Sequence, residues 1–172
     1  MSVEIKALHQ HRLNHAKTMK AAPGTAYLTY YIFEGVLAGT FEREELVVTA
    51  WSGGGGGAKK LPITESMNNP YMYGLKAIEN KHVRGGPIPP GPWIVGAPGP
   101  HKKFKKVVCI LEPRFTLPNG RGGFLIHSQG DKGSDGCIVL PDDVFNKVMD
   151  KLKKSGGGHL HVFQAMDGDA FV

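Results

Sequence analysis

Two side chains with complementary chemistry lie close together in the second half of the chain. His127 ends an apolar run, a glycine-rich segment follows, and Cys137 opens the next apolar run. Only nine residues, three of them glycine, separate the two. Because closing a short, glycine-rich loop costs little entropy, we expect both side chains to meet at one rim of a β-sheet. A thiol nucleophile and its base need this arrangement.

The chemistry that such a pair supports is nucleophilic acyl transfer. A free thiol, with a pKa of ~8.5, is only slightly ionised at neutral pH. An adjacent imidazolium raises the thiolate fraction and later protonates a leaving amine. Gly136, directly before Cys137, would let backbone N–H groups approach a substrate carbonyl, so we expect an oxyanion hole there.

The spacing of His127 and Cys137 alone is also compatible with purely structural roles. Single cysteines and histidines are common, so His127 could be a strand-end histidine and Cys137 a small buried side chain. The glycine-rich context favours catalysis, whereas Cys109, flanked by apolar residues, is expected in the core. Both thiols are expected to be free. A zinc site of His127, His159 and His161 would lack the usual carboxylate or cysteine ligand, so no metal or cofactor is expected.

Short β-prone runs must position the pair. These runs cover residues 27–33, 36–41, 46–51, 93–95, 105–111, 123–127, 137–140 and 159–163, and the first three predict an antiparallel meander. Residues 141–154 predict the clearest helix, because apolar residues recur at helical spacing between early aspartates and late lysines. Residues 53–57 predict a flexible loop. We therefore expect one mainly β domain, residues 23–172, with one packed helix.

Composition narrows the class of partner. The chain has 172 residues and a formal net charge of +6. This charge favours an anionic partner, but lysine predominates over arginine, so nucleic acid is not expected to be the partner. No apolar run approaches the ~18 residues of a membrane span, so no membrane insertion is expected.

Residues 1–22 are expected to be an N-terminal extension with a polar helix over residues 4–20. The extension carries His9, His11 and His15 without a carboxylate or cysteine partner, which favours a solvated face over a metal site. It lacks the apolar segment of a secretory signal peptide. We expect the protein to stay in the cytoplasm of the producing cell unless another route exports it.

The motif around the pair resembles a known family. Ile126-His127-Ser128, followed by Ser134-Asp135-Gly136-Cys137-Ile138, resembles the active-site signature of L,D-transpeptidases of the YkuD type. The compressed loop, with Trp51-Ser52-Gly53, residues 86–91 and residues 121–127 upstream, is more similar to the transpeptidase-like effectors of bacterial type VI secretion systems. The similarity spans roughly residues 25–164.

This resemblance implies an L,D-transpeptidase-like mixed β-sheet and a thioester acyl-enzyme on peptidoglycan stem peptides. Cys137 would attack the L-centre carbonyl of meso-diaminopimelate next to the terminal D-alanine. Water as acceptor gives an L,D-carboxypeptidase, and another amine gives cross-linking or exchange. The carbonyl of Ser128 is expected to orient His127. Antibacterial action in the periplasm of a target cell, secretion machinery and an immunity protein are the implied context.

Two positions depart from the family pattern, at Asp135 and Val139. Asp135 stands where histidine is frequent, and we expect its carboxylate to point away from Cys137. Val139 replaces an Arg or Asn, so a substrate carboxylate needs another partner. The substrate-binding candidates are Ser134, Lys132, Arg121, Arg114, Trp51 and Ser52. The alternatives from other classes are a non-catalytic peptidoglycan-binding module of the same fold and a basic nucleic-acid-binding domain.

Overall fold

The computed structural model describes residues 24–55, 67–74, 85–129 and 134–166. Strands dominate these ranges, and they are accompanied by one α-helix and two single-turn 3-10 helices. The elements are β1 (Ala26–Tyr31), β2 (Val36–Phe41), β3 (Glu44–Thr49), β4 (Trp51–Ser52), η1 (Pro70–Met72), β5 (Gly91–Val95), β6 (Gly99–Pro100), β7 (Val107–Pro113), η2 (Pro118–Gly120), β8 (Leu125–Ser128), β9 (Ile138–Leu140), α2 (Asp142–Ser155) and β10 (Gly158–Phe163). The predicted mainly β fold with one packed helix is confirmed.

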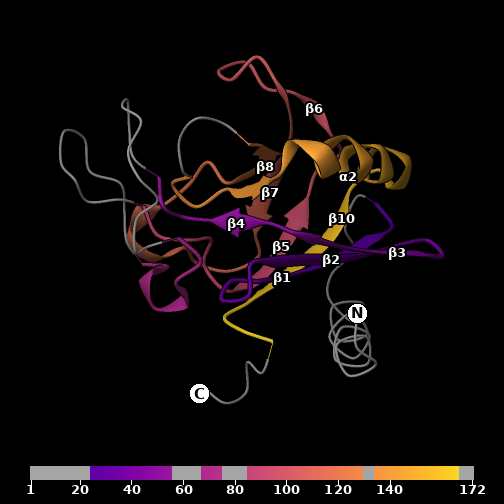
Figure 1. Ribbon diagram of the computed structural model, residues 1–172. Helices are drawn as coiled ribbons and strands as arrows, with labels where there is room; N and C mark the ends of the chain where they lie inside the picture. Colours follow the sequence, from indigo (N-terminus) through magenta and orange to yellow (C-terminus); the bar gives the residue numbers. More distant parts are fainter. Residues whose placement is uncertain (1–23, 56–66, 75–84, 130–133, 167–172) are drawn as a thin grey trace.

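The strands form one continuous mixed sheet (Figure 1). Its order is β3-β2-β1-β10-β5-β7-β8-β9-β4, and β6 pairs with β7. The predicted meander of β1, β2 and β3 is antiparallel, as expected. Two pairs are parallel, β1 with β10 and β8 with β9. His127 lies on β8, and β9 begins directly after Cys137, so this second parallel pair positions the candidate site.

Helix α2 follows β9 directly and covers the sheet next to β2 and β8 (Figure 1). Val148, Met149 and Leu152 lie on its buried face, which explains the helical spacing of apolar residues in the sequence. The helix ends at Gly156, whose φ of 70° is left-handed and whose N–H bonds to the last carbonyls. Helix α2 therefore anchors the strand that begins beside Cys137.

The core lies between the sheet and α2. Cys109 is fully buried there, and its Sγ contacts Met149 Sδ at 3.7 Å. Burial raises the pKa of this thiol to about 12. Cys109 is therefore a core residue, as predicted, and both cysteines are free thiols.

One predicted loop is part of the sheet instead. Gly54 forms a parallel bridge with Ser134, and Gly55 N–H donates to the Ser134 carbonyl at 2.7 Å. The expectation of a flexible loop is wrong for residues 53–55, because their backbone pairs with the segment that precedes Cys137. Residues 56 and 57 lie outside the described residues, as do the N-terminal extension, its expected helix and its three histidines.

Within the described ranges, no helix combines the length and the apolar character that a bilayer span requires.

Candidate active site

The register of β8 and β9 brings His127 and Cys137 to one face of the sheet. His127 pairs with Val139, and Cys137 lies two positions before Val139. Because side chains alternate along a strand, Cys137 faces the same side as His127.

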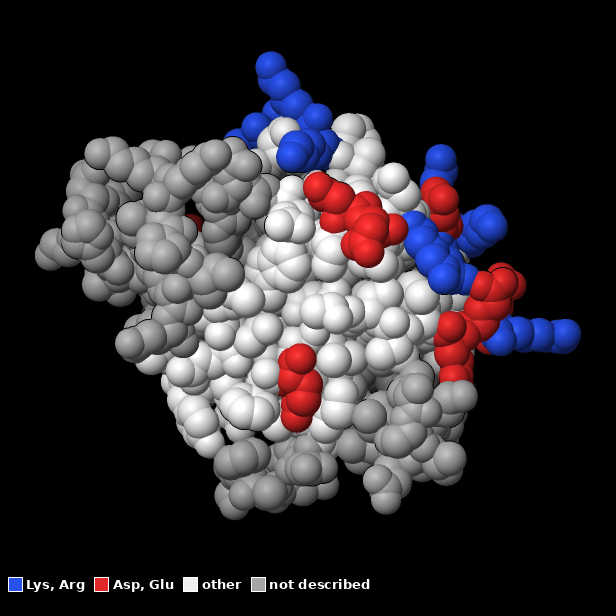
Figure 2. Space-filling view, viewed as in Figure 1, with Lys and Arg blue, Asp and Glu red and all other residues white. Residues whose placement is uncertain are grey.

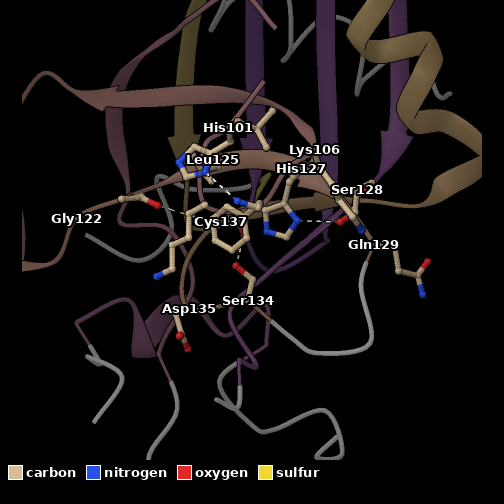
Figure 3. Close-up of a pocket in the computed structure, with 14 residues that line it drawn as sticks. His101, Lys106, Gly122, Leu125, His127, Ser128, Gln129, Ser134, Asp135 and Cys137 are labelled. Carbon is tan, nitrogen blue, oxygen red and sulfur yellow. Dashed lines mark hydrogen bonds between the residues drawn. The ribbon is translucent and has the colours of Figure 1, made fainter. Parts of the chain in front are cut away.

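Both side chains open into one cleft of about 870 Å³ (Figure 3). The strands β7 and β8, the glycines before β8, the segment around Cys137 and the loop between β6 and β7 supply its walls. The lining residues are His101, Lys103, Phe104, Lys106, Val108, Gly122, Gly123, Leu125, His127, Ser128, Gln129, Ser134, Asp135 and Cys137. A cleft of this size accommodates a small-molecule or short peptide ligand.

The His127 ring is oriented by the carbonyl of the next residue. Its Nδ1 lies 2.8 Å from the Ser128 carbonyl oxygen, the contact that the family resemblance implies (Figure 3). Since a carbonyl only accepts, Nδ1 carries the hydrogen and Nε2 keeps its lone pair. Burial lowers the pKa of His127; the Ser128 carbonyl opposes this shift, and the positive charge of Lys106 adds to it. The imidazole is therefore a neutral base at pH 7.

The Cys137 thiol is directed at a backbone carbonyl. Its Sγ–H donates to the Gly123 carbonyl at 3.7 Å. Burial raises the pKa of this thiol, and hydrogen bonds from the Leu125 backbone and the Ser134 side chain only partly oppose the shift. Asp135 raises the pKa further, while Arg121 lowers it. Desolvation of both groups thus disfavours the ionised forms and favours a neutral thiol and imidazole over an imidazolium and thiolate pair.

Position 136 requires a glycine, because of both its backbone conformation and the atoms around it. Its φ is 117°, and a Cβ there would lie 2.4 Å from Arg121 Nη2 and 2.5 Å from Phe124 Cε1. The Gly136 N–H donates to Ser134 Oγ at 3.2 Å. This N–H is therefore engaged by the protein, and the structure gives Gly136 a positioning role.

Ser134 braces the segment that carries Cys137. Its hydroxyl donates to the Cys137 carbonyl at 3.0 Å (Figure 3) and accepts from Gly136 N–H at 3.2 Å. Its backbone N–H donates to the Gly53 carbonyl at 3.1 Å. Ser134 lines the cleft but is buried, so its hydroxyl holds the turn before Cys137 in place.

Arg121 lies behind the cleft and does not line it. Nη1 donates to the carbonyls of Tyr73 and Pro87, the latter at 2.8 Å, and Nη2 donates to those of Gly86 and Asp135 at 2.7 and 3.0 Å. The expectation that Arg121 meets a substrate carboxylate is corrected, because backbone carbonyls occupy both terminal amino groups. We call Arg121 and the four carbonyls that it binds the Arg121 clamp. Burial lowers the pKa of Arg121 to about 10, so the guanidinium stays cationic at pH 7.

Ser52 and Trp51, the candidates on β4, lie on the inner side of the site. The buried Ser52 hydroxyl donates to the Gly136 carbonyl at 3.1 Å and accepts from Ile88 N–H at 2.8 Å. Ser52 therefore fixes the turn before Cys137 rather than reaching the cleft. Trp51 is half-buried and pairs with Val139, so it shares a sheet face with His127 but does not line the cleft.

The remaining candidates lie elsewhere. Lys132 lies outside the described residues. Arg114 follows β7 at the end remote from Val108, close enough to His159 for its charge to lower the pKa of that histidine. His159 and His161 belong to β10, which β5 and β7 separate from β8, and His159 stacks on Tyr27. No trio of His, Cys, Asp or Glu suited to a metal occurs among the described residues.

The Asp135 carboxylate is directed away from Cys137, as expected (Figure 3). Its Oδ1 lies against Gly55 and Gly85, where added Cβ atoms would meet it at 2.3 and 3.0 Å. The side chain is exposed to solvent, which screens its charge from the thiol.

Residues 101–106 were missed as part of the site. Among them, His101, Lys103, Phe104 and Lys106 line the cleft. The only signal in the sequence is a run of lysines around one phenylalanine, which is as typical of a solvated turn as of a binding loop.

No protein-family model and no curated protein matches the chain. Among solved structures, an L,D-transpeptidase (Yku) from Stackebrandtia nassauensis shares 14% identity at a TM-score of 0.40, covering 95% of this chain and 68% of that one. The helical cell shape determining protein Pgp2 from Campylobacter jejuni shares 13% identity at a TM-score of 0.46, covering 91% and 55%. An L,D-transpeptidase from Mycobacterium smegmatis shares 16% identity at a TM-score of 0.38, covering 81% and 58%. The chain thus spans between 55% and 68% of the length of these proteins.

Proposed function

We propose that the protein is a cysteine-dependent L,D-transpeptidase or L,D-carboxypeptidase of peptidoglycan stem peptides, with residues 23–172 as its catalytic domain. The observation that carries the proposal is the placement of Cys137 and His127 in one cleft beside the paired strands β8 and β9, with His127 Nδ1 held by the Ser128 carbonyl. A nucleophile, a base and an orienting acceptor are the parts that thiol-based acyl transfer requires.

The reaction begins from the neutral pair. The thiol turns from the Gly123 carbonyl toward His127, and Sγ attacks the L-centre carbonyl carbon of meso-diaminopimelate while Nε2 takes the thiol proton. Collapse breaks the C–N bond to D-alanine, whose amine receives that proton, and a thioester on Sγ remains. Water, deprotonated by His127, then hydrolyses the thioester; an amine in its place gives a new amide.

An oxyanion hole for this reaction needs a backbone donor beside Cys137. Because Ser134 engages the Gly136 N–H, the N–H of Cys137 itself is the neighbouring candidate. The base contributes ~10²–10⁴ in rate and one oxyanion donor contributes ~10²–10³. The position of this donor and of Sγ depends on the turn before Cys137. Four residues hold that turn in place: Ser52, Arg121, Ser134 and Gly136.

One observation favours a second candidate function, a non-catalytic peptidoglycan-binding module. Burial raises the pKa of the Cys137 thiol, and its Sγ–H donates to the Gly123 carbonyl. A thiol that never leaves this contact would bind a stem peptide without cleaving it.

One experiment separates the two functions. Pure protein is incubated with tetrapeptide-bearing muropeptides, and the products are identified by mass spectrometry. The enzyme proposal expects release of terminal D-alanine, with tripeptide, cross-linked or exchanged products that also reveal the acceptor. Intact muropeptides that nevertheless bind the protein would establish the binding module instead.

The proposed setting of the reaction is the periplasm of a competitor cell. The resemblance of residues 51–53, 86–91 and 121–127 to type VI secretion effectors supports delivery as an antibacterial toxin. A producing cell that delivers such an enzyme needs an immunity protein against it.

A further inference from the structure

The loop between β6 and β7 forms one wall of the cleft. β6 and β7 pair through Gly99 with Val108 and Pro100 with Val107, which leaves residues 101–106 as the connection. His101 N–H donates to the Lys106 carbonyl at 2.9 Å, and Lys105 N–H donates to the His101 carbonyl at 2.8 Å. These bonds close the loop into a defined turn beside the reacting side chains.

The loop concentrates positive charge at the cleft. Lys102, Lys103, Lys105 and Lys106 are all exposed, and none of them forms an ion pair with a described residue. Figure 2 shows lysine side chains gathered at the top of the molecule, where Figure 1 places this loop. Lys103 and Lys106 also line the cleft itself.

Phe104 brings this charge close to the reacting atoms. Although 52% of its surface is exposed, its ring stacks on His127 with centroids 6.5 Å apart and an interplanar angle of 17°. Lys103 Nζ lies 5.8 Å from the centre of the Phe104 ring. The charge of Lys106 is near enough to His127 to act on its titration. Lys103 and Lys106 therefore line the same cleft as Cys137.

The rest of the cleft offers little negative charge to a ligand. Asp135 is the one acidic residue among its described lining residues, and its carboxylate is directed away from Cys137 (Figure 3). Gly122 and Gly123 leave the wall near the thiol open, since an added Cβ at either would meet nothing within 4 Å. The cleft thus combines open space at the nucleophile with an excess of cations on one wall.

We propose that Lys103 and Lys106 bind a carboxylate of the acyl-donor peptide, which makes the substrate an acidic peptide. This inference rests on the proposed function and supplies the anion-binding group that Arg121 does not provide. An ammonium on a flexible stem can follow a carboxylate without a fixed bidentate geometry. The Phe104 ring lies between those of His101 and His127, with a centroid distance of 4.9 Å to His101.

The test compares two double variants that lose the same charge. Lys103→Gln with Lys106→Gln removes the proposed anion site, and Lys147→Gln with Lys153→Gln removes two exposed lysines of α2, away from the cleft. For D-alanine release from an acidic stem peptide, the first variant should raise KM about tenfold while kcat stays within about twofold, the equivalent of ~1.4 kcal/mol in binding. The α2 variant should match the unchanged protein, and Lys103→Arg with Lys106→Arg should restore KM.

Two further arms identify the ligand. A stem peptide with its donor-side carboxylates amidated should bind the unchanged protein and the cleft variant equally well. High salt should weaken binding of the acidic peptide to the unchanged protein and affect the cleft variant far less. An equal rise of KM in both double variants, or no rise in the cleft variant, would overturn the proposal. So would a single-stranded oligonucleotide of equal charge that displaces the peptide with higher affinity.

Binding is also measured by fluorescence anisotropy in a Cys137→Ala background, which keeps the two proposals distinguishable. Lysine-dependent binding of the acidic peptide without any D-alanine release by the unchanged protein would support the carboxylate site and contradict the enzyme. D-alanine release that does not depend on Lys103 and Lys106 would support the enzyme and contradict the carboxylate site.

Discussion

Cys137 and Cys109 carry the same thiol in two different surroundings. Cys109 lies in the core against Met149, whereas Cys137 opens into a cleft that also holds His127. Burial raises the pKa of both thiols, so a low thiol pKa does not distinguish the nucleophile. What distinguishes Cys137 is a base within reach and space for a substrate.

The two cysteines should respond differently to replacement. Cys137→Ala should abolish D-alanine release, because no other described cysteine reaches the cleft. Cys109→Ala should keep the rate within about twofold and lower the free energy of unfolding by about 1 kcal/mol, since it leaves a small void beside Met149. Muropeptide assays and chemical denaturation measure the two effects. Equal activity in both variants would contradict the assignment of the nucleophile.

The neutral pair predicts two different pH profiles. The raised pKa of Cys137 means that alkylation by iodoacetamide should be slow at pH 7 and should rise only through an apparent pKa above ~8.5. The lowered pKa of His127 means that kcat/KM should fall only below about pH 6.5, where the base becomes protonated. Fast alkylation at pH 6, with a plateau above it, would show a preformed thiolate instead.

Asp135→Asn tests the outward orientation of that carboxylate. The side chain is exposed and turned from the thiol, so the alkylation profile should shift only slightly, toward lower pH. Thermal stability should fall modestly if the carboxylate also braces the turn. A large shift of the alkylation profile to lower pH would mean that Asp135 faces Cys137 in solution.

The turn before Cys137 is held by segments that are distant in sequence. Arg121 joins the carbonyls of Tyr73, Gly86, Pro87 and Asp135, and Ser52 joins Gly136 to Ile88. If either side chain is replaced, several buried carbonyls lose their hydrogen-bond donor, which destabilises the fold. The clamp therefore couples the position of the nucleophile to the fold around it.

Arg121→Lys keeps the positive charge and removes the hydrogen-bonding geometry of the clamp, so it tests whether that geometry matters. A lysine cannot reproduce the planar set of donors, so we expect a loss of about 3 kcal/mol in unfolding free energy and a lower kcat with little change in KM. Arg114→Lys, at an exposed arginine outside the cleft, is the matched control and should change neither. If Arg121→Lys does not fold, Ser52→Ala should show a milder loss of the same kind. A raised KM with normal kcat and stability would instead place Arg121 in contact with substrate.

Hydrophobic patterns within short segments of the sequence predicted the strands and the helix around the site. The apolar runs that end at His127 and begin at Cys137 became adjacent parallel strands, and the apolar spacing after residue 141 became α2. The clamp of Arg121, the hydroxyl of Ser52 and the pairing of Gly54 with Ser134 depend on contacts across 14 to 84 residues. Spacing within a motif carries no information about such contacts. The loop over residues 101–106 was missed because only the pairing of β6 with β7 brings it to the cleft.

At the scale of the whole molecule, the described residues form a mainly β fold, and the lysine-rich loop over residues 101–106 supplies one wall of its cleft. The proposed setting makes a prediction about cells. The protein should be harmless when made in the bacterial cytoplasm and toxic when an export signal directs it to the periplasm, and Cys137→Ala should remove that toxicity. Growth curves measure the effect, and toxicity confined to the cytoplasm would point to an intracellular target.

The central claim is that Cys137 forms a covalent bond to the stem peptide, and intact-protein mass spectrometry tests it most directly. Protein mixed with a tetrapeptide donor and quenched in acid should gain the mass of the donor without its D-alanine. Peptide mapping should place that mass on the fragment containing Cys137 and not on the fragment containing Cys109, and Cys137→Ala should gain nothing. Release of D-alanine with no adduct on Cys137, or with an adduct on another residue, would contradict the account.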